Sequence, residues 1–559
     1  MAKSPKQSSK PTTNFWNGDQ TKSAAQTKSS IKRERRKPDF RWLFAAAILI
    51  VAIVAAILIN TEYTKTDATK IANSIDIDND DLKINWDQYQ TINLELSESL
   101  NITESGTYHL TGDLENGSIT IDAGVSEVRL LLDNVTINNP TGPAILAYNA
   151  EDLVVELVGD NTITDGETYD NQYDEDITGV IYSKADLTFQ GDGNLNLTAN
   201  YQDAIIGKDD VKFNSGTYHI DAADDGIRGK DSIYIVDGKF IINSESDCFK
   251  STNETDAGKG FILIENGNFN LTSNSAKGIK STKSILSYGG NYSIQTYDDA
   301  IHSDNYIAFV DGEINISSGD DGIHANRELI IDGGDIYIAK SYEGIEAQVI
   351  TINDGNLNIV ANDDGINAGG GADDSATTSN KDHKTIGAFD ADENCILAIN
   401  GGEIYINAAG DGVDSNGWLY FNGGTTTIDG PTNNGNGSLD SGMGIIMNGG
   451  EVLAVGSSGM AETLGDTSSV NNISIYLTSI QSANTLIEIK DNSDETILEH
   501  NSIKQFSNIT FGSPSLQLGS IYTLYLNGEK YSDFTISGVT TTIGRDNANY
   551  INDFIMSAK

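Results

Sequence analysis

Residues 221–250 read DAADDGIRGKDSIYIVDGKFIINSESDCFK. An acidic, a small and an apolar residue follow one another at 225–227 and again, 22 residues later, at 247–249. Between them lie two short runs with alternating apolar residues, SIYI and KFII, separated by Asp and Gly. Short alternating runs bounded by turn residues predict β-strands, here three to each repeat.

The apolar residue after the small one serves as an anchor for aligning the chain. The anchors are Ile205, Ile227, Phe249, Ile279, Ile301, Ile323, Ile345, Ile366, Val413 and Leu439. Their steps are 22, 22, 30, 22, 22, 22, 21, 47 and 26 residues. The step of 30 contains an insertion near STNETDAGKG, and the step of 47 contains a predicted loop, GGGADDSATTSNKDHKTIGAFDAD. We expect Ile145 and Ile181 to be earlier anchors at irregular spacing.

One unit of this size cannot bury its apolar face, whereas stacked units form a continuous core. The pattern therefore predicts an all-β protein, a right-handed parallel β-helix with three short strands per coil, over residues 96–469. Coils would rise by roughly 4.8 Å, the spacing of strands in a sheet. A leucine-rich repeat would need a helix per unit, and a sandwich of hairpins would not explain the fixed step.

The ends of the chain differ from the repeats. Residues 470–559 contain longer alternating runs and turns such as NGEK, which predict a C-terminal antiparallel β module or cap. Residues 61–95 are polar and predict a linker. The chain contains two cysteines, Cys248 and Cys395, which we expect to be buried thiols rather than a disulfide framework.

Charge is distributed unevenly. Residues 1–43 carry a net charge of +8 and the rest −54, within a total of −46. An acidic body argues against nucleic-acid binding, because contacts to phosphates need Lys and Arg.

Residues 42–59, WLFAAAILIVAIVAAILI, contain no charge and follow the basic segment IKRERRKPDFR. They predict a transmembrane signal anchor over residues 42–60, with a cytoplasmic tail at 1–41 and an extracellular body. Cleavage soon after Asn60 is the alternative.

The alignment places acids in two adjacent columns just before the anchors. In a regular stack these like charges repel by on the order of 1 kcal/mol per pair in water. Turn chemistry explains many such Asp residues, and Ca²⁺, which takes six to eight oxygen ligands, is the sharper alternative. Asp298 and Asp299 with Asp320 and Asp321 make the best pair of coils. The candidate ligands are Asp203, Asp224, Asp225, Asp247, Asp298, Asp299, Asp320, Asp321, Asp363 and Asp364.

The residue after each anchor is expected to point outward, and this column is basic over its first half. It predicts a strip that binds an anionic or hydroxyl-rich polymer, unless each base simply pairs with a neighbouring Asp. Tyrosines near the same turns could stack on sugar rings, although Tyr is also common in strands. The candidate carbohydrate-binding residues are Lys208, Arg228, Lys230, Lys250, Lys280, His302, His324, Tyr297 and Tyr342, with Tyr182 and Tyr201 nearby.

Three stretches carry a family resemblance: DITGVIYSKADLTFQGDGNLNLTANYQDAIIGKDDVKFNSGTYHIDAADDGIRGKDS, the preceding VRLLLDNVTINNPTGPAI with NAEDLVVELVGDNTITDG, and the C-terminal YSDFTISGVTTTIG. In this order they resemble the bacterial carbohydrate-binding β-helix proteins, relatives of pectate-lyase-like folds, over roughly residues 90–545. The resemblance implies a right-handed β-helix, bound calcium and affinity for cellulose or pectin. The membrane anchor is not part of the family pattern.

Three functions follow from these features. The first is a membrane-anchored extracellular module that binds polysaccharide and is stabilised by Ca²⁺. The second is a Ca²⁺-dependent pectate lyase, in which Lys230 or Lys250 would remove the proton at C5 of a uronic acid. The third is a structural or adhesive envelope protein. We favour binding without catalysis, because the candidate residues are spread evenly over the coils; which polysaccharide is bound stays open.

Overall fold

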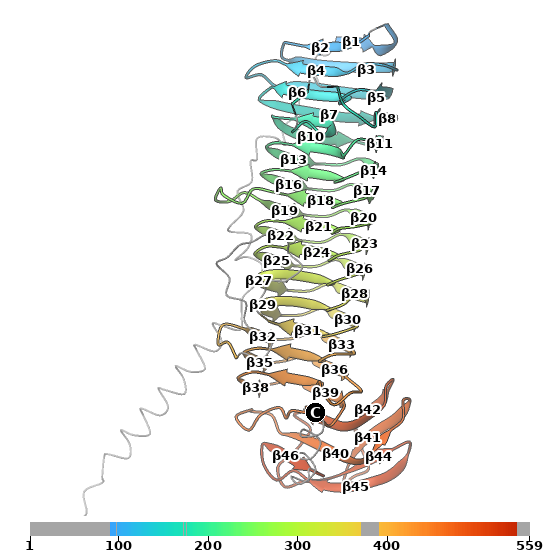
Figure 1. Ribbon diagram of the computed structural model, residues 1–559. Helices are drawn as coiled ribbons and strands as arrows, with labels where there is room; N and C mark the ends of the chain where they lie inside the picture. Colours follow the sequence, from blue (N-terminus) through green and yellow to red (C-terminus); the bar gives the residue numbers. More distant parts are fainter. Residues whose placement is uncertain (1–89, 97, 171–172, 175, 370–390, 545–559) are drawn as a thin grey trace, which may run out of the picture. The chain divides into compact units, whose positions relative to one another are not determined.

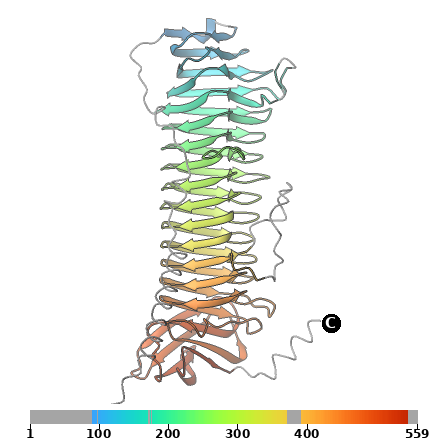
Figure 2. The same cartoon turned by 90° about the vertical axis from the view of Figure 1, so that its left-hand side faces the viewer.

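The computed structural model describes residues 90–96, 98–170, 173–174, 176–369 and 391–544. These residues form a parallel β-solenoid of about 14 coils, followed by antiparallel strands at the C-terminal end (Figure 1). The predicted parallel β-helix with three strands per coil is therefore confirmed. Seen from the side in Figure 2, successive coils lie one above another with their strands in register.

The segment at residues 221–250 shows how one coil is built. β15, β16 and β17 form the coil, and each pairs in parallel with the equivalent strand of the next coil, β18, β19 and β20. Turns at Asp and Gly residues separate the strands, as the composition of the segment predicts. Stacking each strand on its equivalent generates three continuous ladders.

The first ladder contains the anchors. It consists of β2 (Leu100–Ile102), β4 (Ile119–Asp122), β6 (Ile145–Asn149), β9 (Gly179–Ser183), β12 (Asp203–Gly207), β15 (Ile227–Gly229), β18 (Phe249–Ser251), β21 (Ile279–Ser281), β24 (Ile301–Ser303), β27 (Ile323–Ile331), β29 (Ile345–Ile352), β31 (Ile366–Ala368), β34 (Val413–Ser415) and β37 (Leu439–Ser441).

The second ladder follows in each coil, and the long strands β27 and β29 pass through both ladders. It consists of β1 (Gln90–Asn93), β3 (Gly106–Leu114), β5 (Val128–Asn139), β7 (Asp152–Val158), β10 (Asp186–Gly191), β13 (Asp210–Phe213), β16 (Ser232–Ile235), β19 (Phe261–Ile264), β22 (Ser284–Ser287), β25 (Tyr306–Phe309), β27, β29, β32 (Ile396–Ile399), β35 (Trp418–Phe421) and β38 (Gly444–Met447).

The third ladder begins where β3 and β5 bend at a shift in register. It continues through β8 (Asp160–Asp165), β11 (Asn194–Ala199), β14 (Thr217–Ala222), β17 (Lys239–Ser244), β20 (Asn268–Ser273), β23 (Asn291–Gln295), β26 (Glu313–Ser317), β28 (Asp335–Lys340), β30 (Asn356–Ala361), β33 (Glu403–Ala408), β36 (Thr425–Asp429) and β39 (Glu451–Gly456).

The predicted alignment of anchors is correct at every step. Ile301 pairs with Ile323, and the long step is bridged by a direct pairing of Ile366 with Val413. The earlier anchors Ile145 and Ile181 also belong to the ladder. The columns read from the sequence are therefore real neighbours in space.

The core lies inside the coils and is built from the inward residues of all three ladders. An aromatic column shows the arrangement: Tyr218, Phe240, Phe269 and Tyr292 stack on successive third-ladder strands, with ring centroids 4.9, 5.3 and 4.6 Å apart. Such pairs contribute about 0.5–1.5 kcal/mol each beyond their buried area. Both cysteines are buried free thiols, as predicted.

A column of glycines precedes the third ladder, and two of its members show why. Gly334 has φ +94°, and a Cβ there would lie 2.8 Å from the carbonyl oxygen of Gly312 in the preceding coil. Gly402 has φ +87°, and its Cβ would lie 2.6 Å from the carbonyl oxygen of Gly355. Both the left-handed backbone and the close approach of the coils require glycine.

Most pairings of the C-terminal strands are antiparallel, as predicted for this end of the chain. β39 pairs with β43 (Phe506–Gly512), which pairs with β40 (Asn472–Gln481), and β40 pairs in parallel with β46 (Thr540–Ile543). A second sheet contains β41 (Thr485–Asp491), β42 (Thr496–Ser502), β44 (Ile521–Leu526) and β45 (Glu529–Thr535). These strands enclose their own buried cluster, which includes Ile487 and Phe511.

The N-terminal predictions fall largely outside the described residues. β1 and the short 3₁₀ helix η2 (Leu94–Leu96) lie within the stretch predicted as linker, and β1 already pairs with β3. Within the described part of the chain, no helix has the length and apolar character to cross a bilayer. The predicted tail at 1–41 and anchor at 42–60 lie outside that part.

Candidate functional site

The first ladder brings the predicted acids and bases together. An Asp two residues before an anchor and a base one residue after it lie three residues apart in one coil. The strand register then stacks each column. Arg228 lies beside Lys250 of the next coil, and Lys280 lies beside His302, as register partners in the sheet. This edge of the first ladder therefore carries two adjacent columns over residues 203–324, one mainly acidic and one mainly basic.

Three of the predicted carbohydrate-binding residues line one open hollow. Lys208, Arg228 and Lys230 come from adjacent coils and border a groove of about 420 Å³. The groove is further lined by Asp176, Thr178, Gln202, Ile206, Gly207 and Thr252. It is the place where the predicted basic strip meets a concave surface.

Carboxylates hold these three cations in place. Arg228 Nη2 lies 2.7 Å from Asp203 Oδ2, and Thr178 Oγ1 donates to the same oxygen at 2.5 Å. Lys208 Nζ lies 3.2 Å from Asp176 Oδ2. Lys230 contacts Asp231 at 3.3 Å but keeps 51% of its side chain exposed. Each of the three cations thus has a carboxylate partner while lining the groove.

Lys250 sits deeper and bridges two coils. Its Nζ lies 3.1 Å from Asp225 Oδ2 and 2.8 Å from Asp247 Oδ2. Burial alone would lower the pKa of Lys250, but these two carboxylates raise it above its usual value. Burial raises the pKa of Asp225 to about 6, against the attraction of Lys250. Lys250 therefore forms ion pairs within the protein, with Asp225 and Asp247.

The coils predicted to be the best calcium pair hold a lysine instead. Lys277 Nζ lies 2.8 Å from Asp298 Oδ1 and 2.6 Å from Asp299 Oδ2. Lys277 occupies the acidic column of its own coil and reaches the acids of the next one. The expected repulsion at Asp298 and Asp299 is thus offset by an ammonium group. Asp298, Asp299 and Asp320 still offer carboxylate oxygens within 4.8 Å of one another, so Ca²⁺ at these coils stays a prediction.

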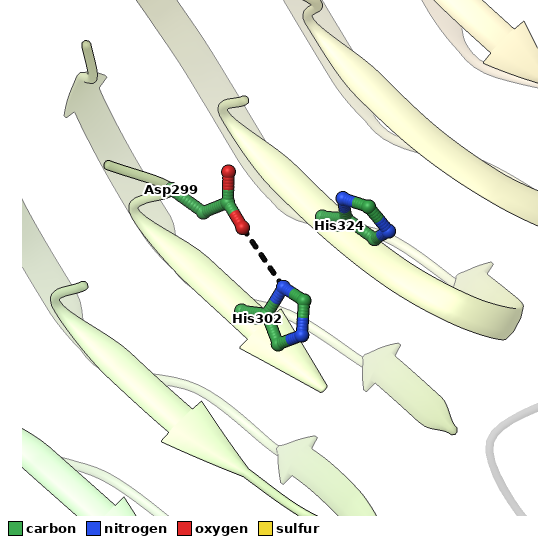
Figure 3. A group of neighbouring side chains, drawn as sticks. All are labelled: Asp299, His302 and His324. Carbon is green, nitrogen blue, oxygen red and sulfur yellow. Dashed lines mark hydrogen bonds and ion pairs between the residues drawn. The ribbon is translucent and has the colours of Figure 1, made fainter. Parts of the chain in front are cut away.

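His302 and His324 are not exposed, which corrects the expected strip at these two positions. Their side chains are 8% and 0% exposed. Figure 3 shows the two rings on neighbouring strands beside Asp299, and His302 Nδ1 lies 2.8 Å from Asp299 Oδ2. Burial would lower the pKa of His324, but Glu346, Asp321 and Asp299 raise it to about 10. Carboxylates packed around these rings remove them from the open surface.

Glu343 lies just before β29 of the first ladder, at the point where basic residues end in the column after the anchors. Burial, and then the charges of Glu346, Asp321 and Asp364, raise its pKa to about 10. Beyond it, the column after the anchors changes to Asn367, Asp414 and Asp440. No described Lys, Arg or His forms an ion pair with these later acids.

Asp364, Asp411 and Asp414 form the strongest oxygen cluster in this later region. One carboxylate oxygen from each lies within 4.8 Å of the others. Burial raises their pKa values first, and mutual repulsion adds to it, giving about 6 for Asp364, about 7 for Asp411 and about 8 for Asp414. All-oxygen donors with uncompensated charge suit a hard cation such as Ca²⁺.

The remaining predicted residues are distributed along the same corner. Tyr297 and Tyr342 are 71% and 48% exposed, so both rings are open for stacking. Tyr182 instead lies under Lys208, whose Nζ is 5.6 Å from its ring centre, and Tyr201 stacks on Tyr169 at 4.4 Å. Asp224, Asp320 and Asp363 lie one residue further from the anchors, at half-buried positions.

Sequence reasoning missed several residues that shape these sites. Asp176 and Thr178 lie in the irregular turn before β9, so no column pointed to them. Asp411 and Asp414 did stand in the aligned columns, and the lack of a basic partner beside them was the signal that could have found them.

Known proteins similar to this chain share one description. A family model described as carbohydrate-binding domain-containing protein matches residues 97–344 and 272–437. A protein of the same description from Acetivibrio thermocellus is 34% identical over 150 residues, which is 26% of this chain and 51% of the relative. The match thus spans about half of the relative's length.

A solved structure is also similar in part. It is described as the polysaccharide lyase-like protein from C. thermocellum, in a gadolinium derivative, and is 28% identical with a TM-score of 0.35. The alignment covers 42% of this chain and 87% of that one. The matches to the family model together run from residue 97 to residue 437, more than half of the 559 residues. The chain therefore belongs to the family of carbohydrate-binding domain-containing proteins.

Proposed function

We propose that this protein binds an extended polysaccharide that carries carboxylate groups, of the pectin type, across the groove at Lys208, Arg228 and Lys230. The observation that carries the proposal is the convergence of three cations on one open hollow in a chain of net charge −46. Guanidinium and ammonium groups bind carboxylates by charge-assisted hydrogen bonds. Membership in the family supports carbohydrate as the ligand class.

The polymer would run along the first ladder, parallel to the stack. Lys280 and the exposed Tyr297 and Tyr342 lie further along that ladder and would extend the contact. Aromatic rings pack against the apolar faces of sugars, and this contact does not require charge. A neutral polymer such as cellulose would depend on the tyrosines alone, so its retention should be weaker.

Ca²⁺ is proposed as a structural ion at Asp364, Asp411 and Asp414. These residues fit it because they offer oxygen donors from adjacent coils and no described base neutralises them. Bound there, the ion would supply the positive charge that Lys250 and Lys277 supply elsewhere on the ladder. Membrane anchoring through residues 42–60, with an extracellular solenoid, remains part of the proposal.

Affinity electrophoresis of the full-length chain in native gels tests the binding. Polygalacturonate should retard the protein more than cellulose derivatives or mannan do. The double variant Lys208→Ala/Lys230→Ala should lose most of this retardation, whereas Lys340→Ala, which removes an exposed lysine on the third ladder, should not. Equal retardation of both variants would place binding elsewhere, and no retardation in any gel would favour an envelope role.

A lyase is the second candidate, and Lys230 is its best base because half of its side chain is exposed beside the groove. Lys250 is a poor base because Asp225 and Asp247 keep it protonated. Incubation with polygalacturonate and Ca²⁺, followed by ultraviolet absorbance of the unsaturated product, tests this. Rising absorbance that Lys230→Ala abolishes would establish the lyase.

A further inference from the structure

Two histidines on consecutive coils form a buried cluster with acids from three coils. His302 lies on β24 and His324 on β27, and the two residues are register partners with ring centroids 4.8 Å apart. Asp299 precedes β24, Asp321 precedes β27, and Glu346 lies on β29. Figure 3 shows three members of this group, Asp299, His302 and His324, on neighbouring strands.

The nitrogens of both rings face carboxylates. His302 has Asp299 Oδ2 at 2.8 Å from Nδ1 and Asp304 Oδ1 at 3.1 Å from Nε2. His324 Nδ1 has two carboxylate oxygens, Asp321 Oδ2 at 3.0 Å and Glu346 Oε2 at 3.2 Å. A single N–H cannot donate well to two anions, so a positive ion at His324 Nδ1 would satisfy Asp321 and Glu346 together. Asp299 Oδ2 also accepts from Lys277 Nζ at 2.6 Å, and Lys277 would give up this contact when Asp299 binds the ion.

A second observation concerns the other nitrogen of His324. The side chain is completely buried, and its Nε2 has no hydrogen-bond partner among the described residues. A buried polar atom without a partner costs free energy, so other contacts of the same ring have to compensate for it. The contacts of Nδ1 with Asp321 and Glu346 therefore hold the ring in place.

We propose that Asp299, His302 and His324, with Asp321 and Glu346, form a binding site for a first-row transition-metal ion of the Zn²⁺ type. Imidazole nitrogen with carboxylate oxygen is a donor set for Zn²⁺, Cu²⁺ or Ni²⁺, whereas Ca²⁺ takes oxygen ligands. The site is therefore distinct from the proposed calcium cluster and independent of carbohydrate binding.

The dimensions of the cluster suit such an ion. Tetrahedral Zn²⁺ with bonds of about 2.0–2.1 Å sets its ligand atoms roughly 3.3 Å apart. The contact between Asp299 and His302 is 2.8 Å, and those of His324 with Asp321 and Glu346 are 3.0 and 3.2 Å, all close to that spacing. Ligand atoms of Asp299, His302 and His324 lie within 4.8 Å of one another, as do those of Asp321, His324 and Glu346. His324 belongs to both groups. Asp304 at His302 Nε2 would orient that ring, as second ligand shells do.

Zn²⁺ binding to the full-length chain tests the site. The metal-free protein is titrated with ZnCl₂ against a chromophoric chelator in excess Ca²⁺, which keeps the oxygen cluster occupied. We expect one Zn²⁺ per chain, and Co²⁺ in place of Zn²⁺ should give the visible absorption bands of a low-coordinate site. Absence of Zn²⁺ uptake under these conditions would overturn the proposal.

Variants locate the ion. His302→Gln and His324→Gln should each weaken Zn²⁺ binding by about 10-fold or more, while His219→Gln, at an exposed histidine on β14, should leave it unchanged. Far-UV circular dichroism reports whether each variant folds. X-ray absorption of Zn²⁺ in the unaltered protein gives a readout that needs no variant: imidazole scattering supports the site, and an all-oxygen shell refutes it.

Discussion

Two parts of the first ladder place acids in the same column but give them different neighbours. Between residues 203 and 324, here called the base-containing coils, cations such as Arg228, Lys250 and Lys277 lie against the acids. Between residues 364 and 440, the acid-only coils, the adjacent column is Asn367, Asp414 and Asp440. The same backbone therefore carries stacked acids in two ways, with built-in cations in the first part and with raised carboxyl pKa values in the second.

The pKa values of two acids in the same column differ between the two parts. The partners His302 and Lys277 hold the pKa of buried Asp299 well below its usual value, although burial would raise it. Burial, and then the repulsion of Asp364, raise that of Asp411 to about 7. Asp225, beside Lys250, also has a raised pKa of about 6, so burial and the neighbouring column together set the charge state.

The largest expected effect comes from breaking the base-containing coils. Lys277→Met leaves Asp298 and Asp299 without their ammonium group, and removal of one partner from a buried pair costs about 3–5 kcal/mol. Urea denaturation of the full-length chain should show this loss. Lys530→Met is the control, because the Lys530–Asp533 pair is 53% and 52% exposed and its loss should change stability little. Equal effects would contradict the comparison.

Without Ca²⁺, the acid-only coils should make the free energy of unfolding depend on pH. The pKa values of Asp364, Asp411 and Asp414 are raised in the folded state, so the folded protein keeps protons that the unfolded chain releases. Stability in EDTA should therefore fall as pH rises from about 4 to about 8. At pH 8, Ca²⁺ at about 100 times its Kd should restore roughly 2.7 kcal/mol. Calorimetric melting that is insensitive to Ca²⁺ at pH 8 would exclude the ion.

Polymer binding should also distinguish the two parts. Lys208→Ala/Lys230→Ala in the base-containing coils should weaken polygalacturonate binding by about 10-fold, or about 1.4 kcal/mol. Asp440→Asn in the acid-only coils should change it little. Isothermal titration with oligogalacturonates at two salt concentrations measures both; a larger effect of Asp440→Asn would reverse the assignment.

The smallest effect is expected from relieving repulsion. Asp414→Asn removes one charge from the acid-only cluster and should stabilise the Ca²⁺-free protein at pH 8 by about 1 kcal/mol, while lowering its response to Ca²⁺. Asp533→Asn, at an exposed site, should do neither. Destabilisation by Asp414→Asn without Ca²⁺ would show that the cluster is satisfied in another way.

Much of the fold could be predicted because it is encoded in a period. Each anchor pairs with the next, so the 22-residue step fixed strand register before any coordinates, even across the insertion between Ile366 and Val413. The irregular N-terminal turns, including Asp176 and Thr178 in the groove, have no period and could not be placed in this way.

The sequence by itself determined the ladders and the columns of acids and bases, because side chains one period apart must become neighbours in a parallel stack. The tertiary structure decided which charges meet. Lys277 reaches the acids of the following coil, His324 is buried among carboxylates, and Asp414 faces other acids. These outcomes depend on side-chain reach and burial across coils, which the repeat leaves undefined.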